Sequence, residues 1–249
     1  MSNSPLVVYT KLSPNCNTPR KYKIDTITIH HMAGNGTIEA VGNMFANPSR
    51  QGSSNYGVGS DGRIGLYVDE ANRAWTSSSP ENDHRAITIE VANDTNAPNW
   101  TVSDKALKSL ILLCADICKR NGIKRLLWQN DKNLIGQAEK QNMTKHNWFA
   151  ATTCPGPYLE SKFGYIADEV NKILKVEEEK VTYDEWKKYY KQYETEQESL
   201  KPDSWAVEPQ KWCKDNGISD GTYPKRYITR QEVWAMFKRL YDFILKKGV

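Results

Sequence analysis

Residues 25–34 read Asp25-Thr-Ile-Thr-Ile-His-His-Met-Ala-Gly34. The residues between the aspartate and the histidines are all β-branched, which favours a β-strand, and their apolar density predicts a central place in a sheet. The strand ends on two histidines, His30 and His31, and a glycine follows soon after. Successive side chains of a strand point to opposite faces, so only one of the two histidines can serve a site on a given face.

The segments around this strand alternate between strand and helix patterns. Asn55–Val68 contains the turn signal Ser60-Asp61-Gly62 and predicts a hairpin, and Ala86–Ala92 predicts another strand. Residues 69–85 are expected to form a loop. The other expected elements are a helix over 38–46, a helix over 103–121, a short strand over 126–129 and a final helix ending near 174. This alternation predicts an α/β domain over residues 1–174, with a mixed central β-sheet flanked by helices.

The composition changes at residue 175. Residues 175–203 are charged and lack glycine, which predicts a helical linker. Aromatic residues recur along it at spacings of 3, 4 and 3, a heptad-like pattern that extends to Val176 and Leu200. This aromatic seam consists of Tyr183, Trp186, Tyr190 and Tyr193. Three interpretations stay open: packing against the same chain, a homo-oligomer contact through the 176–200 helix, or a solvated linker.

Residues 204–249 predict a small, mainly α-helical domain. A first helix is expected to end at Asn216-Gly217, a C-cap signal, and Thr229-Arg-Gln-Glu232 is a capping box that opens a second helix. The first helix carries Trp205, Val207 and Trp212. The residues expected on the inner face of the second helix are Val233, Met236 or Phe237, Leu240 and Ile244. A unit of about 45 residues is small for an independent core, so we expect it to pack on the preceding helix or on another copy.

The composition argues against several classes of protein. The net charge of the 249 residues is only +4, so charge gives no indication of nucleic-acid binding. No apolar run approaches the roughly 20 residues of a membrane helix. The first residues lack the basic-then-apolar pattern of a secretory signal, so we expect synthesis in the cytoplasm and, for action outside, release by another route. The five irregularly spaced cysteines do not predict a disulfide framework.

Residues far apart in the sequence have the chemistry of a zinc site. Zinc binds histidine nitrogen and cysteine thiolate in a tetrahedron, and a catalytic site uses three protein ligands and leaves one position for water. One histidine of the strand, together with His146 and Cys154, can supply three ligands. His146 and Cys154 are eight residues apart in a segment without regular pattern, so both can reach one ion. Periodicity alone does not choose between His30 and His31.

Four motifs occur in the order of one known family. They are Ile27-Thr-Ile-His-His-Met-Ala-Gly34, Asn55-Tyr-Gly-Val58 followed by Asp61-Gly-Arg-Ile64, Ile87-Thr-Ile-Glu-Val91, and His146-x7-Cys154-Pro-Gly156. The chain from about residue 5 to 174 resembles the type 2 N-acetylmuramoyl-L-alanine amidases, which include phage endolysins and peptidoglycan recognition proteins. The resemblance implies a Zn²⁺ enzyme that cuts the amide between muramic acid and L-alanine. It implies His30, His146 and Cys154 as metal ligands and His31 in packing.

Three residues are candidates for catalysis. Glu90 is a carboxylate in an apolar strand, which is costly to bury unless it is used or paired. The family often has a glutamate here, so we expect Glu90 to accept the proton of the attacking water, with a salt-bridged structural glutamate as the alternative. Tyr56 matches the family's Asn-Tyr and is expected to hydrogen-bond that water or the substrate, or else to pack on the hairpin. Thr152 falls where relatives carry a Lys or Thr that stabilises the oxyanion.

Four other residues are candidates for the substrate groove. Aromatic faces and amides suit sugars and peptides, which points to Trp75, Asn93 and Trp148, and packing explains each of them equally well. His84 lies in a polar segment and is expected to be exposed, with a place along the groove as its alternative.

The tail carries a second resemblance. Trp212-Cys-Lys-Asp-Asn-Gly-Ile-Ser-Asp-Gly-Thr-Tyr-Pro224 and Ile228-Thr-Arg-Gln-Glu-Val233 resemble surface-layer-homology repeats at the ends of phage lysins, which implies binding to a cell-wall polymer. The leading hypothesis is therefore a phage endolysin that acts on bacterial peptidoglycan after holin-type release. The alternatives are a host autolysin, a non-catalytic peptidoglycan-recognition protein, and a zinc enzyme that cuts a peptide bond of the wall stem.

Overall fold

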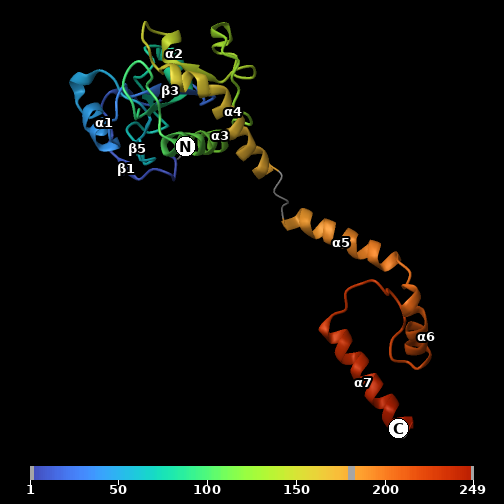
Figure 1. The fold of residues 1–249 in the computed structure, drawn as a ribbon. Coiled ribbons are helices and arrows are strands. Elements are labelled where there is room, and N and C mark those ends of the chain that lie inside the picture. Colours follow the sequence, from blue (N-terminus) through green and yellow to red (C-terminus); the bar gives the residue numbers. More distant parts are fainter. Residues whose placement is uncertain (1–2, 179–182, 248–249) are drawn as a thin grey trace. The chain divides into compact units, whose positions relative to one another are not determined.

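A computed structural model describes residues 3–178 and 183–247. The chain divides into two compact units, Met1–Glu179 and Lys180–Val249. Figure 1 labels their elements. No helix in the described ranges is long and apolar enough to cross a membrane.

The first unit is built on a six-stranded sheet with the strand order β1-β5-β4-β7-β3-β8. The strands are β1 (Tyr9–Thr10), β3 (Thr26–His31), β4 (Tyr56–Val58), β5 (Ile64–Leu66), β7 (Ala86–Val91) and β8 (Met143–Lys145). The β4–β5 hairpin is antiparallel and every other pair in this sheet is parallel, so the sheet is mixed. A separate antiparallel pair joins β2 (Cys16–Asn17) to β6 (Arg73–Ala74). The predicted α/β fold with a mixed central sheet is confirmed.

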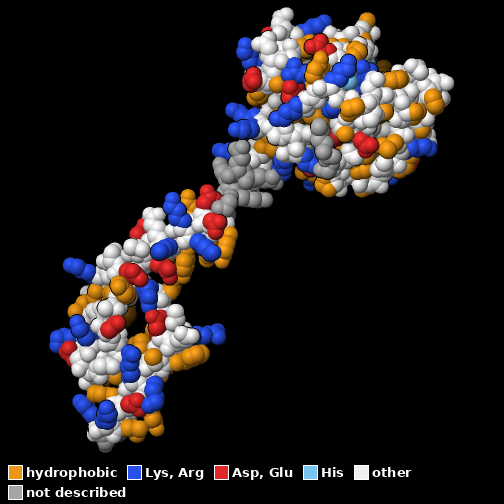
Figure 2. Space-filling model, turned by 180° about the vertical axis from the view of Figure 1, so that it is seen from behind, with side chains coloured by type: hydrophobic (Ala, Val, Ile, Leu, Met, Phe, Trp, Pro, Cys, Tyr) orange, Lys and Arg blue, Asp and Glu red, His pale blue; other side chains and the backbone are white. Residues whose placement is uncertain are grey.

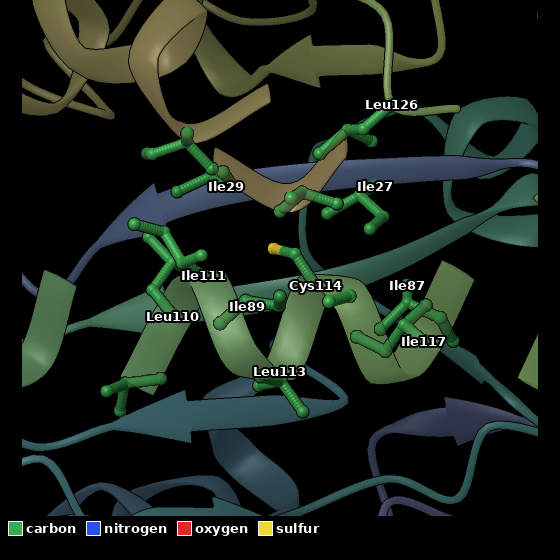
Figure 3. Close-up of a cluster of buried hydrophobic side chains, with 14 of the residues drawn as sticks. Ile27, Ile29, Ile87, Ile89, Leu110, Ile111, Leu113, Cys114, Ile117 and Leu126 are labelled. Atoms are coloured by element: carbon green, nitrogen blue, oxygen red, sulfur yellow. The ribbon is translucent and has the colours of Figure 1, made fainter. Parts of the chain in front are cut away.

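One face of this sheet carries the apolar core. The isoleucines of β3 and β7 point from the sheet toward α3 (Asp104–Asn121), as Figure 3 shows. The same core includes residues of α4 (Pro157–Glu178), which packs beside α3. Ser103 caps the start of α3 and Gly122 ends it with a positive φ, so the predicted helix over 103–121 is confirmed.

The opposite face carries β3 and β7 side chains that are largely polar. It is covered by α1 (Ile38–Phe45) and α2 (Pro80–Arg85). Thr37 caps α1, and Val41 and Phe45 are buried as expected, whereas Met44 is exposed. Beneath α2 the hydroxyls of Thr28 and Thr144 lie 2.8 Å apart and both bond the Asn82 amide, so this layer is hydrogen-bonded rather than apolar.

Two local predictions are wrong. Residues 126–129 form no strand, because the Leu127 N–H is bonded by the Asn142 side chain and the place beside β3 is taken by β8. Residues 69–85 are not all loop, because they contain β6 and α2. Ser79 followed by Pro80 is a regular helix start, since serine accepts a backbone N–H and proline fits the first turn.

The second unit contains three helices: α5 (Tyr183–Ser199), α6 (Val207–Asp215) and α7 (Arg230–Lys247). Gly217 ends the α6 segment with a positive φ, and Thr229 and Glu232 exchange both bonds of the predicted capping box. Within residues 183–247, Ile218 is the sole buried residue. Phe237 and Ile244 are exposed, so the prediction that Ile244 faces inward is wrong.

Hydrophobic side chains lie among charged ones on the surface of the second unit in Figure 2. In the aromatic seam, Tyr183, Trp186 and Tyr190 are exposed and stack in succession, with ring centroids 6.0 and 5.3 Å apart. The Tyr193 ring lies 6.3 Å from that of Tyr227, so the end of the seam packs on its own unit. The Val176 side chain is outside the described residues. A subunit contact through the 176–200 helix stays a prediction.

Candidate metal centre

Adjacent parallel strands bring His30 and His146 together. Ile29 of β3 is paired with Lys145 of β8, so the next residue of each chain segment, His30 and His146, lies at the same edge of the sheet. Their ring centroids are 4.9 Å apart. The loop after His146 returns Cys154, whose Sγ lies 3.4 Å from His30 Nδ1. One ligand atom from each residue of this three-residue cluster lies within 4.8 Å of the other two.

This geometry fits a tetrahedral zinc ion. Zn–N and Zn–S bonds of about 2.05 and 2.3 Å at a tetrahedral angle place nitrogen and sulfur about 3.6 Å apart, close to the 3.4 Å between His30 and Cys154. His30 Nδ1 is the ring nitrogen that faces Cys154, whereas Nε2 of the same ring is buried and has no hydrogen-bond partner in the described part of the chain. The cluster contains His30 and not His31, which lies against Trp100 at a ring distance of 5.1 Å.

The protonation chemistry of the cluster also fits a cation. Burial lowers the pKa of His30, and His146 beside it lowers it further, so the imidazole is neutral and keeps a lone pair for a metal. Burial lowers the pKa of His146 as well. Burial raises the pKa of the Cys154 thiol and Glu90 adds to this, while the backbone N–H of His31 favours the thiolate. A bound divalent cation would hold that thiolate deprotonated.

Glu90 lies on the same face of the sheet as His30. The two residues are paired across the β7–β3 ladder, and paired residues of neighbouring strands share a face. Burial raises the pKa of Glu90 to about 8, and the positive charge of Arg50 opposes this rise. No ion pair to Glu90 occurs among residues 3–178 and 183–247, so the structural alternative lacks its salt-bridge partner there.

A hollow opens beside the cluster. Its volume is about 540 Å³, and its lining includes Glu90, His146, Thr152 and Cys154. Part of its apolar lining comes from α1, with Ala40, Val41, Met44 and Phe45. The exposed Met44 side chain thus contributes to the lining of this hollow instead of the core.

The match to known families comes from this same part of the chain. The family model described as N-acetylmuramoyl-L-alanine amidase matches residues 20–157, more than half of the sequence. The chain belongs to this amidase family. No curated protein sequence matches the chain.

Several solved structures are similar to this chain. The Staphylococcus aureus hydrolase AmiA, in complex with its ligand, has a TM-score of 0.51 at 15% identity, covering 70% of this chain and 86% of AmiA. The endolysin amidase LysCS from Clostridium intestinale has a TM-score of 0.43 at 21% identity, covering 66% and 98% of the two chains. A selenomethionine derivative of AmpD has a TM-score of 0.48 at 19% identity, covering 67% and 99%. At these identities AmiA supports the fold of the amidase and no more.

Tyr56 lies on the wrong face for catalysis. It is paired with Ile89, one residue before Glu90, so its side chain points to the core face. Its buried hydroxyl donates to Glu70 Oε1 at 2.6 Å and accepts the Ser4 N–H at 2.9 Å. Arg120 in turn bonds the same glutamate. The prediction that Tyr56 touches the attacking water or the substrate is wrong, because a one-residue shift along a strand reverses the face.

The Tyr56→Phe variant separates these roles. We expect the free energy of unfolding to fall by about 1–3 kcal/mol, because buried Glu70 and the Ser4 N–H lose a hydrogen-bond partner. We expect wall-digesting activity per folded molecule to match that of the wild type. Chemical denaturation and a turbidity assay measure the two quantities, with exposed Tyr22→Phe as the matched control. An activity loss at wild-type stability would return Tyr56 to the site.

Thr152 lies where the prediction put it, in the lining of the hollow beside Cys154. Its Oγ1 accepts the Cys154 backbone N–H at 3.2 Å, which leaves the hydroxyl proton for a group in the hollow. Its role toward an oxyanion stays a prediction.

A cluster that sequence reasoning missed supports the loop with two of the ligands. Lys145 Nζ bonds Glu160 Oε1 at 2.5 Å and lies 5.2 Å from the ring centroid of Trp148. Trp148 stacks on Trp128 with ring centroids 5.3 Å apart. The Asn147 N–H bonds the Cys154 carbonyl, which closes the loop between the ligands. Trp148 is thereby explained by packing, and no local sequence signal indicates this cluster, because Trp128 and Glu160 are distant from Lys145 in the sequence.

The structure gives the other three groove candidates different surroundings. Trp75 lines a second hollow of about 310 Å³ and donates its indole N–H to Asn17 at 2.8 Å. Asn93 is buried and bonds the Trp100 carbonyl, so packing explains it. His84 is buried in α2 and accepts the Lys21 N–H at 3.0 Å, so the expectation of an exposed loop residue is wrong.

Ser78 is a further contact that the sequence did not reveal. Its Oγ lies 3.4 Å from His146 Nε2, and its backbone has a positive φ of 64°. The preceding residue is fixed by Asp83, whose carboxylate accepts the N–H and the hydroxyl of Ser77. The α2 segment therefore contributes to the position of a metal-ligand candidate.

Proposed function

We propose that this amidase hydrolyses the amide bond between N-acetylmuramic acid and L-alanine in bacterial peptidoglycan, with zinc held by His30, His146 and Cys154. The observation that carries the proposal is the three-residue cluster with a carboxylate, Glu90, on the same face and an open hollow beside both. Zinc, when bound, supplies Lewis acidity for the scissile carbonyl and for the water that attacks it.

Glu90 moves the proton in this proposal. It accepts a proton from the attacking water and delivers it to the nitrogen of the leaving L-alanine as the C–N bond breaks. The pKa of about 8 for the metal-free protein suits a group that both takes and returns a proton near neutral pH. Thr152 donates a hydrogen bond to the oxygen on which negative charge develops.

Wall digestion with and without a chelator tests the proposal. We expect turbidity loss of purified walls to stop when the metal is removed and to resume on addition of Zn²⁺. Full activity of protein shown by elemental analysis to be metal-free would exclude the zinc role.

We further propose that the chain is a phage endolysin in which residues 1–174 cut, residues 175–203 link and residues 204–249 bind a cell-wall polymer. The division of the chain into two units supports separate cutting and tail parts. The wall-binding role rests on the resemblance of the tail motifs. A non-catalytic recognition role is not favoured, because Cys154 is present and lies beside His30.

Removal of the tail tests the wall-binding part. We expect the full chain to sediment with purified walls and a chain ending at residue 179 to lose binding by at least about tenfold, because two linked modules on one insoluble polymer reinforce each other. Hydrolysis of small soluble muropeptides should not differ between the two forms. Equal sedimentation of both forms would contradict a binding role for the tail.

A further inference from the structure

A second hollow lies next to the metal centre. Ser78 lines it and also lies 3.4 Å from His146 Nε2, so this hollow opens next to a metal-ligand candidate. Arg50 lines both this hollow and the one beside Glu90, so the two hollows share this residue. Arg73 and Trp75 form part of the same lining.

The two arginines of this hollow differ from most others in the first unit. Arg63, Arg85 and Arg120 each form an ion pair, and Arg20 is bonded to backbone carbonyls. Neither Arg50 nor Arg73 has a side-chain hydrogen bond or an ion pair within the described part of the chain, and Arg73 Nε is buried without a partner. A buried unsatisfied donor is rare and calls for a ligand or water.

The acidic residue in this lining is already occupied. Asp83 accepts the backbone N–H groups of Thr76 and Ser77 and the Ser77 hydroxyl. Its charge is near enough to Arg73 that this guanidinium opposes the rise in its pKa that burial causes, yet the two form no ion pair. The lining of the hollow therefore contains two arginines whose guanidinium groups are bound by no carboxylate of residues 3–178 and 183–247.

We propose that Arg50 and Arg73 bind a carboxylate of the stem peptide, and that the amidase thereby prefers stems whose second residue keeps a free α-carboxylate. The inference rests on the proposed function, which places the scissile amide at the metal centre. An arginine fork matches a carboxylate geometrically and forms charge-assisted hydrogen bonds with it.

The reach of the substrate agrees with this assignment. The second stem residue is a glutamate linked through its side-chain carboxyl, so its α-carboxyl is either free or amidated. Two residues of extended chain span about 7 Å, which lets this group reach a hollow adjoining the metal ligands. The sugar side carries no carboxylate once the lactyl group is in the scissile amide, so the hollow is assigned to the peptide.

Two muropeptides that differ only in a free or amidated glutamate α-carboxylate test the inference. Full-length wild type should cleave the free acid with a kcat/KM about tenfold higher, mainly through KM, the lower end of what a charge-assisted hydrogen bond supplies. The double variant Arg50→Gln, Arg73→Gln should lose this preference, which is measured as the ratio of the two kcat/KM values because Arg50 also acts on the pKa of Glu90 and the absolute rate can change with it. The double variant Arg50→Lys, Arg73→Lys should keep part of the preference, because lysine retains the positive charge but lacks the paired N–H donors of the guanidinium.

Two controls make the outcome decisive. Arg125→Gln removes another exposed arginine, which lines hollows with Lys124 away from the metal ligands, and should retain the preference. The single variant Arg50→Gln changes an exposed side chain, so it can replace the double variant in this test if the double variant misfolds. Calorimetric titration of the metal-free wild type with both muropeptides reports affinity without activity.

The possible results separate the two proposals. Equal wild-type constants for both muropeptides, or a preference that survives in the double variant, would overturn the carboxylate site and leave the amidase function intact. Absence of cleavage of either muropeptide would overturn the function, and the calorimetric ratio would then decide the carboxylate site on its own.

Discussion

The Cys154→Ser variant is expected to lose tight zinc binding and to lower wall-digesting activity by more than about 100-fold. Cys154 Sγ lies 3.4 Å from His30 Nδ1 and supplies the one thiolate of the cluster. Loss of a group that merely orients a ligand costs 10–100-fold in metal affinity or activity, so loss of a ligand should cost more. Elemental analysis of the purified variant measures zinc per chain directly.

A matched variant isolates this effect from the chemistry of cysteine itself. Cys16→Ser removes a half-buried thiol of β2 outside the cluster and should keep one zinc per chain and full activity. Thermal unfolding of both metal-free variants shows whether either is misfolded. Unchanged zinc content in folded Cys154→Ser would exclude this residue as a ligand.

The Glu90→Gln variant is expected to lose about 10²- to 10⁴-fold in activity while its metal-free form gains stability at high pH. The activity loss follows from removal of the base, whose contribution has this size in other enzymes. Zinc content should stay at the wild-type level, because Glu90 is not in the cluster. Glu81→Gln, on the exposed side of α2, is the matched control and should change neither quantity.

The sign of the stability change follows from the pKa of Glu90. In the folded metal-free protein burial raises it from 4.5 to about 8, so the native state holds this proton more tightly than the unfolded state. The contribution of Glu90 to stability is therefore present below about pH 4.5, falls as pH rises toward 8, and is flat above. Glutamine cannot ionise, so the variant escapes this loss.

Denaturation at two pH values measures the effect. We compare the free energy of unfolding of metal-free Glu90→Gln with that of the metal-free wild type at each pH. The advantage of the variant should be about 2 kcal/mol larger at pH 9 than at pH 5, a value that allows for water at the half-buried side chain. The pKa values of His30 and His146 are lowered in both proteins. Their effect on the free energy of unfolding therefore cancels when the variant is compared with the wild type. A difference that does not depend on pH would show that the Glu90 carboxylate is ionised in the fold.

The sequence predicted the part of the site that depends on strand alternation, but not the parallel pairing of β3 with β8 that places His146 beside His30. The β-branched run before His30 marked a central strand, and the alternation of that strand explains why His31 packs on Trp100 instead of joining the cluster. The same alternation is the reason that the prediction for Tyr56 is wrong. Its motif matched, but the face of a strand residue depends on register with β7, which is set by tertiary pairing and not by the local sequence.

Long-range partners were out of reach of sequence reasoning. Nothing near Lys145 in the sequence indicates Glu160 and Trp128 as its partners, and nothing near Ser78 indicates His146. The error at residues 126–129 has the same origin. An apolar run predicts a strand, but here the Asn142 side chain takes the N–H that a ladder would use.

The tail shows the limit of amphipathic patterns. The spacing of apolar residues predicted two helices and their caps, and the structure has them. The same pattern does not state what covers the apolar face, and Phe237 and Ile244 remain exposed in the second unit. The sequence pattern predicts a helix and its caps. Burial of the apolar face of that helix needs other apolar elements to pack against it, and a unit of this size offers few of them.

Identification of the bond that is cut tests the central claim most directly. Purified peptidoglycan is digested with the zinc-loaded chain, and the new termini are labelled and identified by mass spectrometry. We predict new N-terminal L-alanine and intact glycan strands without new reducing ends. New N-termini on any other amino acid, or new reducing ends on the glycan, would contradict the assignment.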